Sequence, residues 1–253
     1  MSALLIVVGL YLTLAVYVAL QQRTYIFPAP PRGRTPAHAD RLVKLSSGQS
    51  FIYLPGAPVV VHFHGNGEDL ADAGSMIDLL RSLGVGVLAA EYPGYGISPG
   101  RASEDALYAS AEMALHWLRD EQHVPPERVV LQGQSLGSGL AAEMARRGLG
   151  GRLILISPFT SMASLGQRFF PWLPVAPLVR HRFDTLSKAP GIGVPVLIVH
   201  GTEDELVPFS MGEELARVFP RATLRPIPGG HHNDLLWLHA REVRAAIAEA
   251  VGR

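Results

Sequence analysis

Continuous runs of apolar, mostly β-branched residues alternate along this chain with longer segments that have a helical pattern. The runs PVVVHFHG, GVGVLAA, RVVLQG, RLILIS and VPVLIVHG do not alternate in polarity, which is typical of strands buried on both faces of a sheet. Strands that alternate with helices form βαβ units, which build a mainly parallel sheet with helices on both faces. We therefore predict an α/β fold. Helices are expected at residues 70–83, 102–122, 136–147, 210–219 and 234–251.

Only the segment RLVKLSSGQSFIYLP departs from this alternation, because it predicts two short antiparallel strands around Ser47 and Gly48. In a mainly parallel sheet the reactive groups gather outside the carboxyl ends of the strands. The residues that directly follow each apolar run are therefore the first candidates for a functional site.

Composition narrows the function classes. A chain of 253 residues can bury a substantial core, and 48% of these residues are apolar. The formal net charge is zero and no stretch clusters basic residues, so we expect no nucleic-acid partner. Because the chain has no cysteine, it cannot form disulfides, bind a metal through thiolates or use a cysteine nucleophile.

The beginning of the chain differs from everything after it. The segment ALLIVVGLYLTLAVYVAL, residues 3–20, has no charged side chain. As a helix it would extend for ~27 Å, near the lower limit for crossing a bilayer. We predict an N-terminal membrane anchor over residues 1–22, with the lipid bilayer as its partner. A cleaved signal peptide and a buried core helix remain as alternatives.

Basic residues follow this apolar segment, whereas only the α-amine precedes it. These residues are Arg23, Arg32, Arg34 and Arg41. The positive-inside rule therefore predicts that the bulk of the chain faces the cytoplasm. Residues 23–40 are rich in proline and small residues, which indicates an extended connector. The main domain is then expected at residues 41–253.

Ser135 lies in the segment GQSLG, which satisfies the pattern Gly-x-Ser-x-Gly. A predicted strand precedes this segment and a predicted helix follows it, as expected for a nucleophile on a sharp strand-to-helix turn. Gly133 and Gly137 are needed because such a turn leaves no room for Cβ atoms near the serine. A tight packing turn without chemistry is the alternative, but the context favours a nucleophile.

A serine hydroxyl needs a base to become a nucleophile, and the base needs a group that orients it. His231 and His232 are adjacent in GGHHND, after the last predicted strand. Asp204 follows the run VLIVHG after two residues, with Glu203 and Glu205 on either side as alternative acids. The order serine, aspartate, histidine is the one expected of this architecture.

Six segments make the chain from about residue 41 onward similar to the α/β-hydrolases: HFHGNGED, EYPGYGISPG, GQSLGSG, SPFTSM, HGTEDELVP and GGHHND. The chain most resembles the small-lid, N-terminally anchored branch that includes eukaryotic protein depalmitoylases and their bacterial relatives. The resemblance implies an α/β-hydrolase fold with a short lid, preceded by one transmembrane helix, and a serine hydrolase activity.

The resemblance also favours one of the two adjacent histidines as the base. In that branch the motif around the base reads glycine-histidine-asparagine-aspartate. Matching Asn233 and Asp234 to it puts the base at His232, with His231, the alternative base, where a glycine usually stands. Asp234 is then expected in the first turn of the final helix.

An oxyanion hole and the choice of acid are implied in the same way. By family position Asp204 is preferred over the two flanking glutamates. The resemblance implies that the backbone N–H groups of Asn66 and Leu136 bind the oxyanion. Leu136 also begins a predicted helix, whose unpaired N–H groups favour developing negative charge.

Two further features have both a structural and a functional interpretation. His62 and His64 alternate along a predicted strand, but a metal site there would lack further ligands, so we expect no metal and no cofactor. Residues 157–190 are expected to form the lid and contain the apolar stretch RFFPWLPVAPLV. This stretch either packs over the sheet or forms an acyl-binding wall that touches the bilayer.

The sequence therefore predicts a serine hydrolase that cleaves carboxylic ester or thioester bonds of lipid-like acyl substrates through an acyl-enzyme. Ser135 is the expected nucleophile, His232 the base and Asp204 the orienting acid. An amidase, peptidase or acyltransferase with the same three residues is the alternative. A catalytically inactive, membrane-bound interaction scaffold is a further one.

Overall fold

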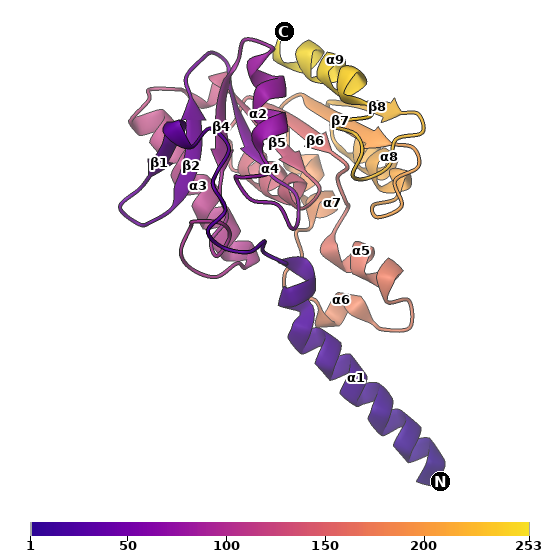
Figure 1. Ribbon diagram of the computed structural model, residues 1–253. Coiled ribbons are helices and arrows are strands. Elements are labelled where there is room, and N and C mark those ends of the chain that lie inside the picture. The colour runs from indigo at the N-terminus through magenta and orange to yellow at the C-terminus, as the bar shows by residue number, and fades with distance from the viewer. Residues whose placement is uncertain (1, 253) are drawn as a thin grey trace.

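The computed structural model describes residues 2–252 (Figure 1). Residue 1, where the predicted anchor begins, and residue 253, where the predicted main domain ends, lie outside this range. Eight strands form one sheet in the order β1-β2-β4-β3-β5-β6-β7-β8. The strands are β1 (Leu42–Lys44), β2 (Ser50–Leu54), β3 (Val59–Phe63), β4 (Gly86–Ala90), β5 (Val129–Gln134), β6 (Arg152–Ile156), β7 (Val196–Gly201) and β8 (Ala222–Ile227).

The sheet is mainly parallel, as predicted. From β4 through β3 to β8 every neighbouring pair of strands is parallel. Strands β1 and β2 form the expected antiparallel pair, and β2 is also antiparallel to β4. From β3 onward each connection to the next strand contains a helix, and the parallel pairing places the carboxyl ends of β3 to β8 at one edge of the sheet.

Helices cover both faces of this sheet (Figure 1). The helices of the domain are α2 (Gly74–Arg81), α3 (Glu104–Asp120), α4 (Leu136–Arg146), α5 (Met162–Phe169), α6 (Val175–Leu178), α7 (Thr185–Lys188), α8 (Phe209–Val218) and α9 (Ala240–Val251). Residues of α3, α4 and α8 share one apolar core, and residues of α2 and α9 share another. Successive residues of β3 contribute to these two cores in turn, since Val59 and Val61 pack into the first and Val60 into the second. The strand is buried on both faces, as its continuous apolar run predicts.

Helix α1 (Ser2–Ile26) projects from the domain as one long rod (Figure 1). It continues past residue 22, the predicted end of the anchor, and its last residue Ile26 is buried with Phe27 in the core beneath α3 and α4. Within the described range, Ala3–Ile26 is the one helix that is long and apolar enough to cross a membrane. Its outer part is exposed, in keeping with an environment other than a protein core.

Two helices begin four or more residues later than the sequence predicts. The final helix α9 starts at Ala240, so the expectation that Asp234 lies in its first turn is wrong. The Asp234 carboxylate instead accepts the backbone N–H of His231 at 2.8 Å, and its carbonyl accepts the N–H groups of the turn that follows. Helix α2 starts at Gly74 rather than at residue 70. Before it, the Asp69 carboxylate accepts the backbone N–H of Ala71 at 2.8 Å. In both places an aspartate offers the backbone a local partner that competes with the helix.

The segment between β6 and β7 carries three short helices, α5, α6 and α7, which lie within the region expected to form the lid. Helices α5 and α6 lie away from the sheet and beside α1 (Figure 1). We refer to residues 157–190 as the lid from here on.

Candidate active site

Ser135 occupies a strained turn between β5 and α4. Its backbone has φ 48° and ψ −115°, a conformation that a residue with a side chain rarely adopts. The neighbouring glycines permit the turn, as the sequence predicts: a Cβ atom at Gly133 would overlap the backbone of Gly137, and one at Gly137 would overlap the carbonyl oxygen of Phe63. The backbone N–H of Ser135 donates to the carbonyl of Ile156 at 2.9 Å. The surrounding strands therefore hold the serine hydroxyl at the carboxyl edge of the sheet.

The loop after β8 brings His232 to this hydroxyl. Its Nε2 atom lies 3.0 Å from Ser135 Oγ, and its Nδ1 atom lies 2.8 Å from Asp204 Oδ2. The His232 side chain is 9% exposed and the Asp204 side chain is fully buried. Asp204 lies on the loop after β7, so the three side chains follow the carboxyl ends of β5, β7 and β8 and form one chain of hydrogen bonds.

The Asp204 carboxylate is held in place by several donors. Its Oδ1 atom accepts the backbone N–H groups of Leu206 at 3.1 Å and Val207 at 2.7 Å. His200, which is fully buried on β7, has its Nε2 atom 3.3 Å from Asp204 Oδ2 and 2.9 Å from Val207 O. Burial alone would raise the pKa of Asp204, but hydrogen bonds from His200 and His232 hold this pKa well below its usual range. The carboxylate is therefore ionised at neutral pH.

The alternative base His231 and the alternative acids Glu203 and Glu205 lie outside this chain of hydrogen bonds. His231 faces solvent, with its Nδ1 atom 3.1 Å from Glu205 Oε2 and its Nε2 atom 3.8 Å from Glu203 Oε2. A hydrogen bond with Glu205 raises the pKa of His231. The two glutamates are exposed at the loop tip, with their carboxylates beside the His231 imidazole. The structure thus brings His232 and Asp204 to Ser135, and leaves His231 at the surface.

Asn66 and Leu136 both line the cavity into which Ser135 opens. Leu136 is the first residue of α4, so its backbone N–H has no partner within the helix. Asn66 lies on the loop after β3. The carboxylate of Glu68 accepts the N–H of Gly65 at 2.7 Å and shapes this loop from within.

Behind the loop, His64 is fully buried, and the hydroxyl of Tyr92 donates to the His64 carbonyl at 2.7 Å. The imidazole of His64 lies against the Tyr92 ring with 3.9 Å between centroids, and its Nε2 atom is 3.3 Å from Glu91 Oε1. His64 thus fixes the loop that carries Asn66. His62 is also buried and hydrogen bonds through Nδ1 to the side-chain oxygen of Gln132. Across residues 2–252, no group of three or more histidine, aspartate or glutamate side chains has the arrangement of a metal site.

A cavity of about 200 Å³ extends from Ser135 between the lid and α1. Apart from Ser135, Asn66 and Gln22, its walls are apolar or glycine. They are formed by Leu136, Phe159, Met162, Leu165, Gly166, Phe169, Phe170, Leu173, Val175, Leu178 and Val179 on the domain side and by Val18, Ala19, Tyr25 and Ile26 on α1. The space next to the hydroxyl therefore suits a hydrocarbon chain.

Sequence reasoning missed two groups of residues at this site. His200 contacts the Asp204 carboxylate, but a histidine inside an apolar run gives no sign of which partner it will meet. The cavity-lining residues of α1 fall in the predicted anchor (Val18, Ala19 and Gln22) and in the predicted connector (Tyr25 and Ile26). A uniformly apolar segment has no distinct face that would indicate this contact. Gln22, the polar residue at the end of that segment, is the one signal that could have indicated a protein contact.

Comparison with known proteins places the chain in a family. A family model described as alpha/beta hydrolase fold matches residues 58–186. An uncharacterized protein of Mycobacterium tuberculosis is 33% identical over 246 residues, which cover 91% of this chain and 87% of that protein. The chain belongs to the alpha/beta hydrolase family.

A further relative agrees with this assignment, and solved structures agree with the fold. Alpha/beta hydrolase domain-containing protein 17C of Xenopus tropicalis is 37% identical over 185 residues, which cover 72% of this chain but 58% of that protein. The fold matches an esterase of Pyrococcus furiosus with a TM-score of 0.72 and 19% identity, covering 89% of this chain and 98% of that one. A monoacylglycerol lipase of Paleococcus ferrophilus matches with a TM-score of 0.61 and 22% identity, covering 79% and 97%. The predicted α/β-hydrolase fold is confirmed, and family membership supports a hydrolase.

Proposed function

We propose that this alpha/beta hydrolase cleaves carboxylic ester or thioester bonds of lipid-like acyl substrates by way of a covalent acyl-enzyme. The observation that supports this most strongly is the hydrogen-bond chain from Ser135 Oγ through His232 to Asp204. Such a chain activates a serine hydroxyl that is otherwise a weak nucleophile.

In the proposed reaction, Ser135 Oγ attacks the carbonyl carbon of the substrate while its proton passes to His232 Nε2. Asp204 holds the imidazole by its Nδ1–H and stabilises the positive charge that develops there. The backbone N–H groups of Asn66 and Leu136 bind the oxyanion. The tetrahedral intermediate collapses, the C–O or C–S bond breaks, and the leaving alcohol or thiol takes the proton from His232. Water, deprotonated by His232, then attacks the acyl-enzyme; the bond between Ser135 Oγ and the acyl carbon breaks, the acid is released, and His232 returns the proton to Ser135 Oγ.

The cavity beside Ser135 supports an acyl group as the part of the substrate that is recognised. Its walls are almost entirely apolar, and no charged side chain lines it within the described part of the chain. Burial of a hydrocarbon chain there would supply binding free energy of about 0.8 kcal/mol for each methylene group. An acyl chain would fill the space between the lid and α1, with its carbonyl carbon at Ser135.

We also propose that α1 inserts into a membrane and that the domain lies on the cytoplasmic side. The exposed apolar surface of α1 and the basic residues that follow it support this orientation. Protease protection of a C-terminal tag in intact cells, with digestion after the membrane is opened, is the expected result. Digestion of the tag in intact cells or spheroplasts would contradict the orientation.

Hydrolysis of p-nitrophenyl esters tests the proposed reaction. Wild-type protein is expected to release p-nitrophenol, and Ser135→Ala to lower kcat by roughly 10⁶-fold or to background. Ser46→Ala, at an exposed serine far from the cavity in sequence, is the matched control and should keep the wild-type rate. A Ser135→Ala protein that hydrolyses the esters as fast as wild type would refute the proposal.

A further inference from the structure

One face of α1 packs against the lid instead of facing outward. Ala15 is buried together with Leu173 and Val175 of the lid. Further along α1, the residues that line the cavity follow Ala15 at intervals of three and four, which puts them on the same face of the helix. They are Val18, Ala19, Gln22 and Ile26.

The opposite face of the same turns is exposed. Val16 is 56% exposed and Leu20 is 67% exposed, although each is next in sequence to a residue that contacts the lid or the cavity. The helix therefore has two surfaces with the same apolar composition and different surroundings. Only one of them meets the space next to Ser135.

Gln22 fastens this face to the lid. Its side-chain oxygen accepts the backbone N–H of Arg180 at 2.7 Å, and its side-chain nitrogen lies 3.3 Å from the carbonyl oxygen of Leu178. Leu178 is the last residue of α6, so its carbonyl has no partner within the helix, and Arg180 follows two residues later. Gln21, the neighbouring glutamine, is exposed. A polar side chain at the end of an apolar helix thus holds the main chain of the lid.

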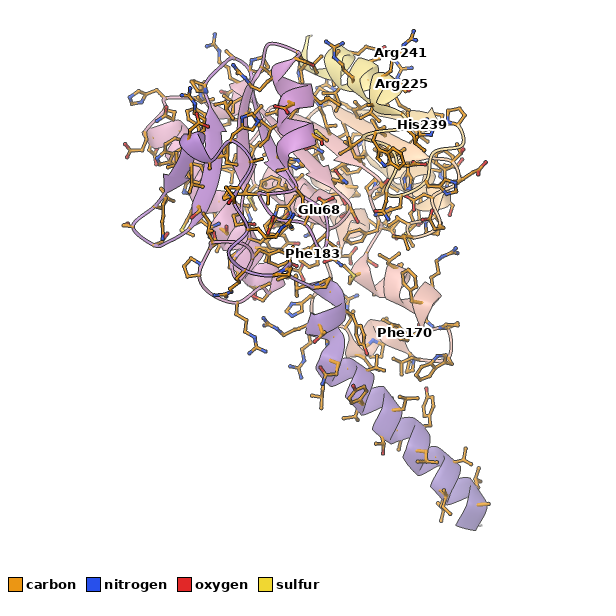
Figure 2. All side chains as sticks on the ribbon, in the orientation of Figure 1. Glu68, Phe170, Phe183, Arg225, His239 and Arg241 are labelled. Atoms are coloured by element: carbon orange, nitrogen blue, oxygen red, sulfur yellow. The ribbon has the colours of Figure 1, made fainter. Side chains whose placement is uncertain are left out.

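Aromatic side chains continue the contact on both sides of Gln22. Toward the N-terminus, the Tyr11 hydroxyl donates to the carbonyl of Trp172 at 3.1 Å, and their ring centroids are 6.2 Å apart. Toward the domain, the ring centroids of Tyr25 and Phe170 are 6.1 Å apart, and Figure 2 shows Phe170 beside α1. The contact between α1 and the lid therefore extends over more than three turns of the helix.

We propose that α1 is a wall of the acyl-binding site, so that Val18, Ala19 and Gln22 determine which acyl chains reach Ser135. This inference rests on the proposed hydrolysis of acyl esters. An acyl chain bound at Ser135 lies between the lid and α1, in contact with the helix along the face that contains Ala19. Gln22 is a positioning residue, which sets the width of the site by holding the lid at its distance from the helix.

The depth of the lid follows from the exposed apolar surface of α1, which does not end where the contact with the lid begins. Val16 and Leu20 are apolar and exposed beside Ala15 and Ala19, so the surface suited to lipid continues along the part of α1 that packs on the lid with its other face. If α1 crosses a bilayer, the lid alongside Ala15 lies at the level of that bilayer, where the exposed rings of Phe169 and Trp172 meet lipid. The acyl chain then enters from the hydrocarbon along α1.

The acyl-chain preference of two variants tests this proposal. Ala19→Trp fills the cavity from the α1 side, and each methylene group that it excludes should lower kcat/KM by a factor of about four. We expect kcat/KM for p-nitrophenyl palmitate to fall at least about tenfold more than kcat/KM for the butyrate ester. Val18→Ala enlarges the cavity and should shift the preference toward longer chains. The matched controls Leu20→Trp and Val16→Ala change exposed neighbours and should keep the wild-type profile.

Crosslinking tests the contact without relying on activity. The chain has no cysteine, so Gln22→Cys with Arg180→Cys introduces one pair of thiols across the interface. In membranes, a short bismaleimide is expected to crosslink this pair and to crosslink Gln21→Cys with Arg180→Cys much less. Equal crosslinking of the two pairs, or none, would overturn the packing of α1 on the lid.

The two experiments separate this inference from the proposed function. If wild type hydrolyses esters and Ala19→Trp has the same chain-length profile as Leu20→Trp, the wall is overturned and the hydrolase stands. If the position-22 pair crosslinks but wild type hydrolyses no ester of any length, the proposed function is overturned, and with it the role of α1 in selecting acyl chains, while the contact itself stands.

Discussion

His232 Nε2 lies 3.0 Å from Ser135 Oγ, although 97 positions separate the two residues in the sequence. His231, its neighbour in sequence, instead lies beside Glu205 at the surface. His232→Gln is therefore expected to lower kcat for ester hydrolysis by roughly 10⁴-fold or more, because the proton of Ser135 loses its acceptor. His231→Gln should stay within about threefold of wild type. Steady-state kinetics on one soluble ester checks both, and the reverse ranking of the two variants would assign the base to His231.

Asp204→Asn tests the orienting carboxylate. An amide at this position could donate where the carboxylate accepts, so it would favour the wrong tautomer of His232 while the geometry is kept. We expect kcat to fall by roughly 10⁴-fold. Glu205→Gln is the control, because that carboxylate faces His231 at the surface, and its kcat should be unchanged. A Glu205→Gln variant as impaired as Asp204→Asn would contradict the assignment of the acid.

Gly137→Ala tests the close packing beneath the nucleophile. A Cβ atom there would overlap the carbonyl oxygen of Phe63 on β3, so α4 and the Ser135 turn would have to move away from the sheet. Such overpacking should lower the free energy of unfolding by about 3 kcal/mol. Gly191→Ala, at a glycine with open space around it, should change the free energy of unfolding by less than about 0.5 kcal/mol. Chemical denaturation of both proteins measures the difference, and equal stabilities would show that the turn tolerates a side chain.

His62 gives the folded protein a specific sensitivity to acid. Burial lowers the pKa of His62 from 6.5 to about 4, and its hydrogen bond with Gln132 opposes the shift only in part. Between these two pKa values the unfolded chain binds a proton that the folded chain does not, so the free energy of unfolding falls as the pH falls from about 6.5 toward 4. Relative to neutral pH, His62 should contribute a loss of about 2 kcal/mol at about pH 5.

Chemical denaturation of wild type and His62→Asn at neutral pH and at about pH 5 measures this contribution to the free energy of unfolding. Asparagine does not titrate and can still donate to Gln132, so the variant should lose about 2 kcal/mol less than wild type on acidification. Parallel losses in the two proteins would mean that His62 is not the group responsible.

The features that the sequence predicted depend on local patterns. Continuous apolar runs identified β3 and its neighbours because burial on both faces removes the need for polar residues. Gly133 and Gly137 identified the turn at Ser135 because only glycine fits beside it. The late start of α9 was missed. The Asp234 carboxylate accepts the N–H of His231 instead of beginning a helix, and this hydrogen bond depends on the conformation of the loop, which the sequence pattern does not show. The contact of Ala15 with the lid was missed for another reason: every face of residues 3–20 is apolar, so no periodicity distinguishes the packed face from the exposed one.

Covalent labelling by a fluorophosphonate tests the central claim, that Ser135 is an activated nucleophile. Such a probe reacts with a serine whose proton is taken by a neighbouring base, and leaves ordinary serines unmodified. We expect peptide mass spectrometry of the labelled wild-type protein to find the adduct on Ser135, with labelling abolished in Ser135→Ala and strongly slowed in His232→Gln. Folded wild-type protein that stays unlabelled, or that carries the adduct on another serine, would contradict the account.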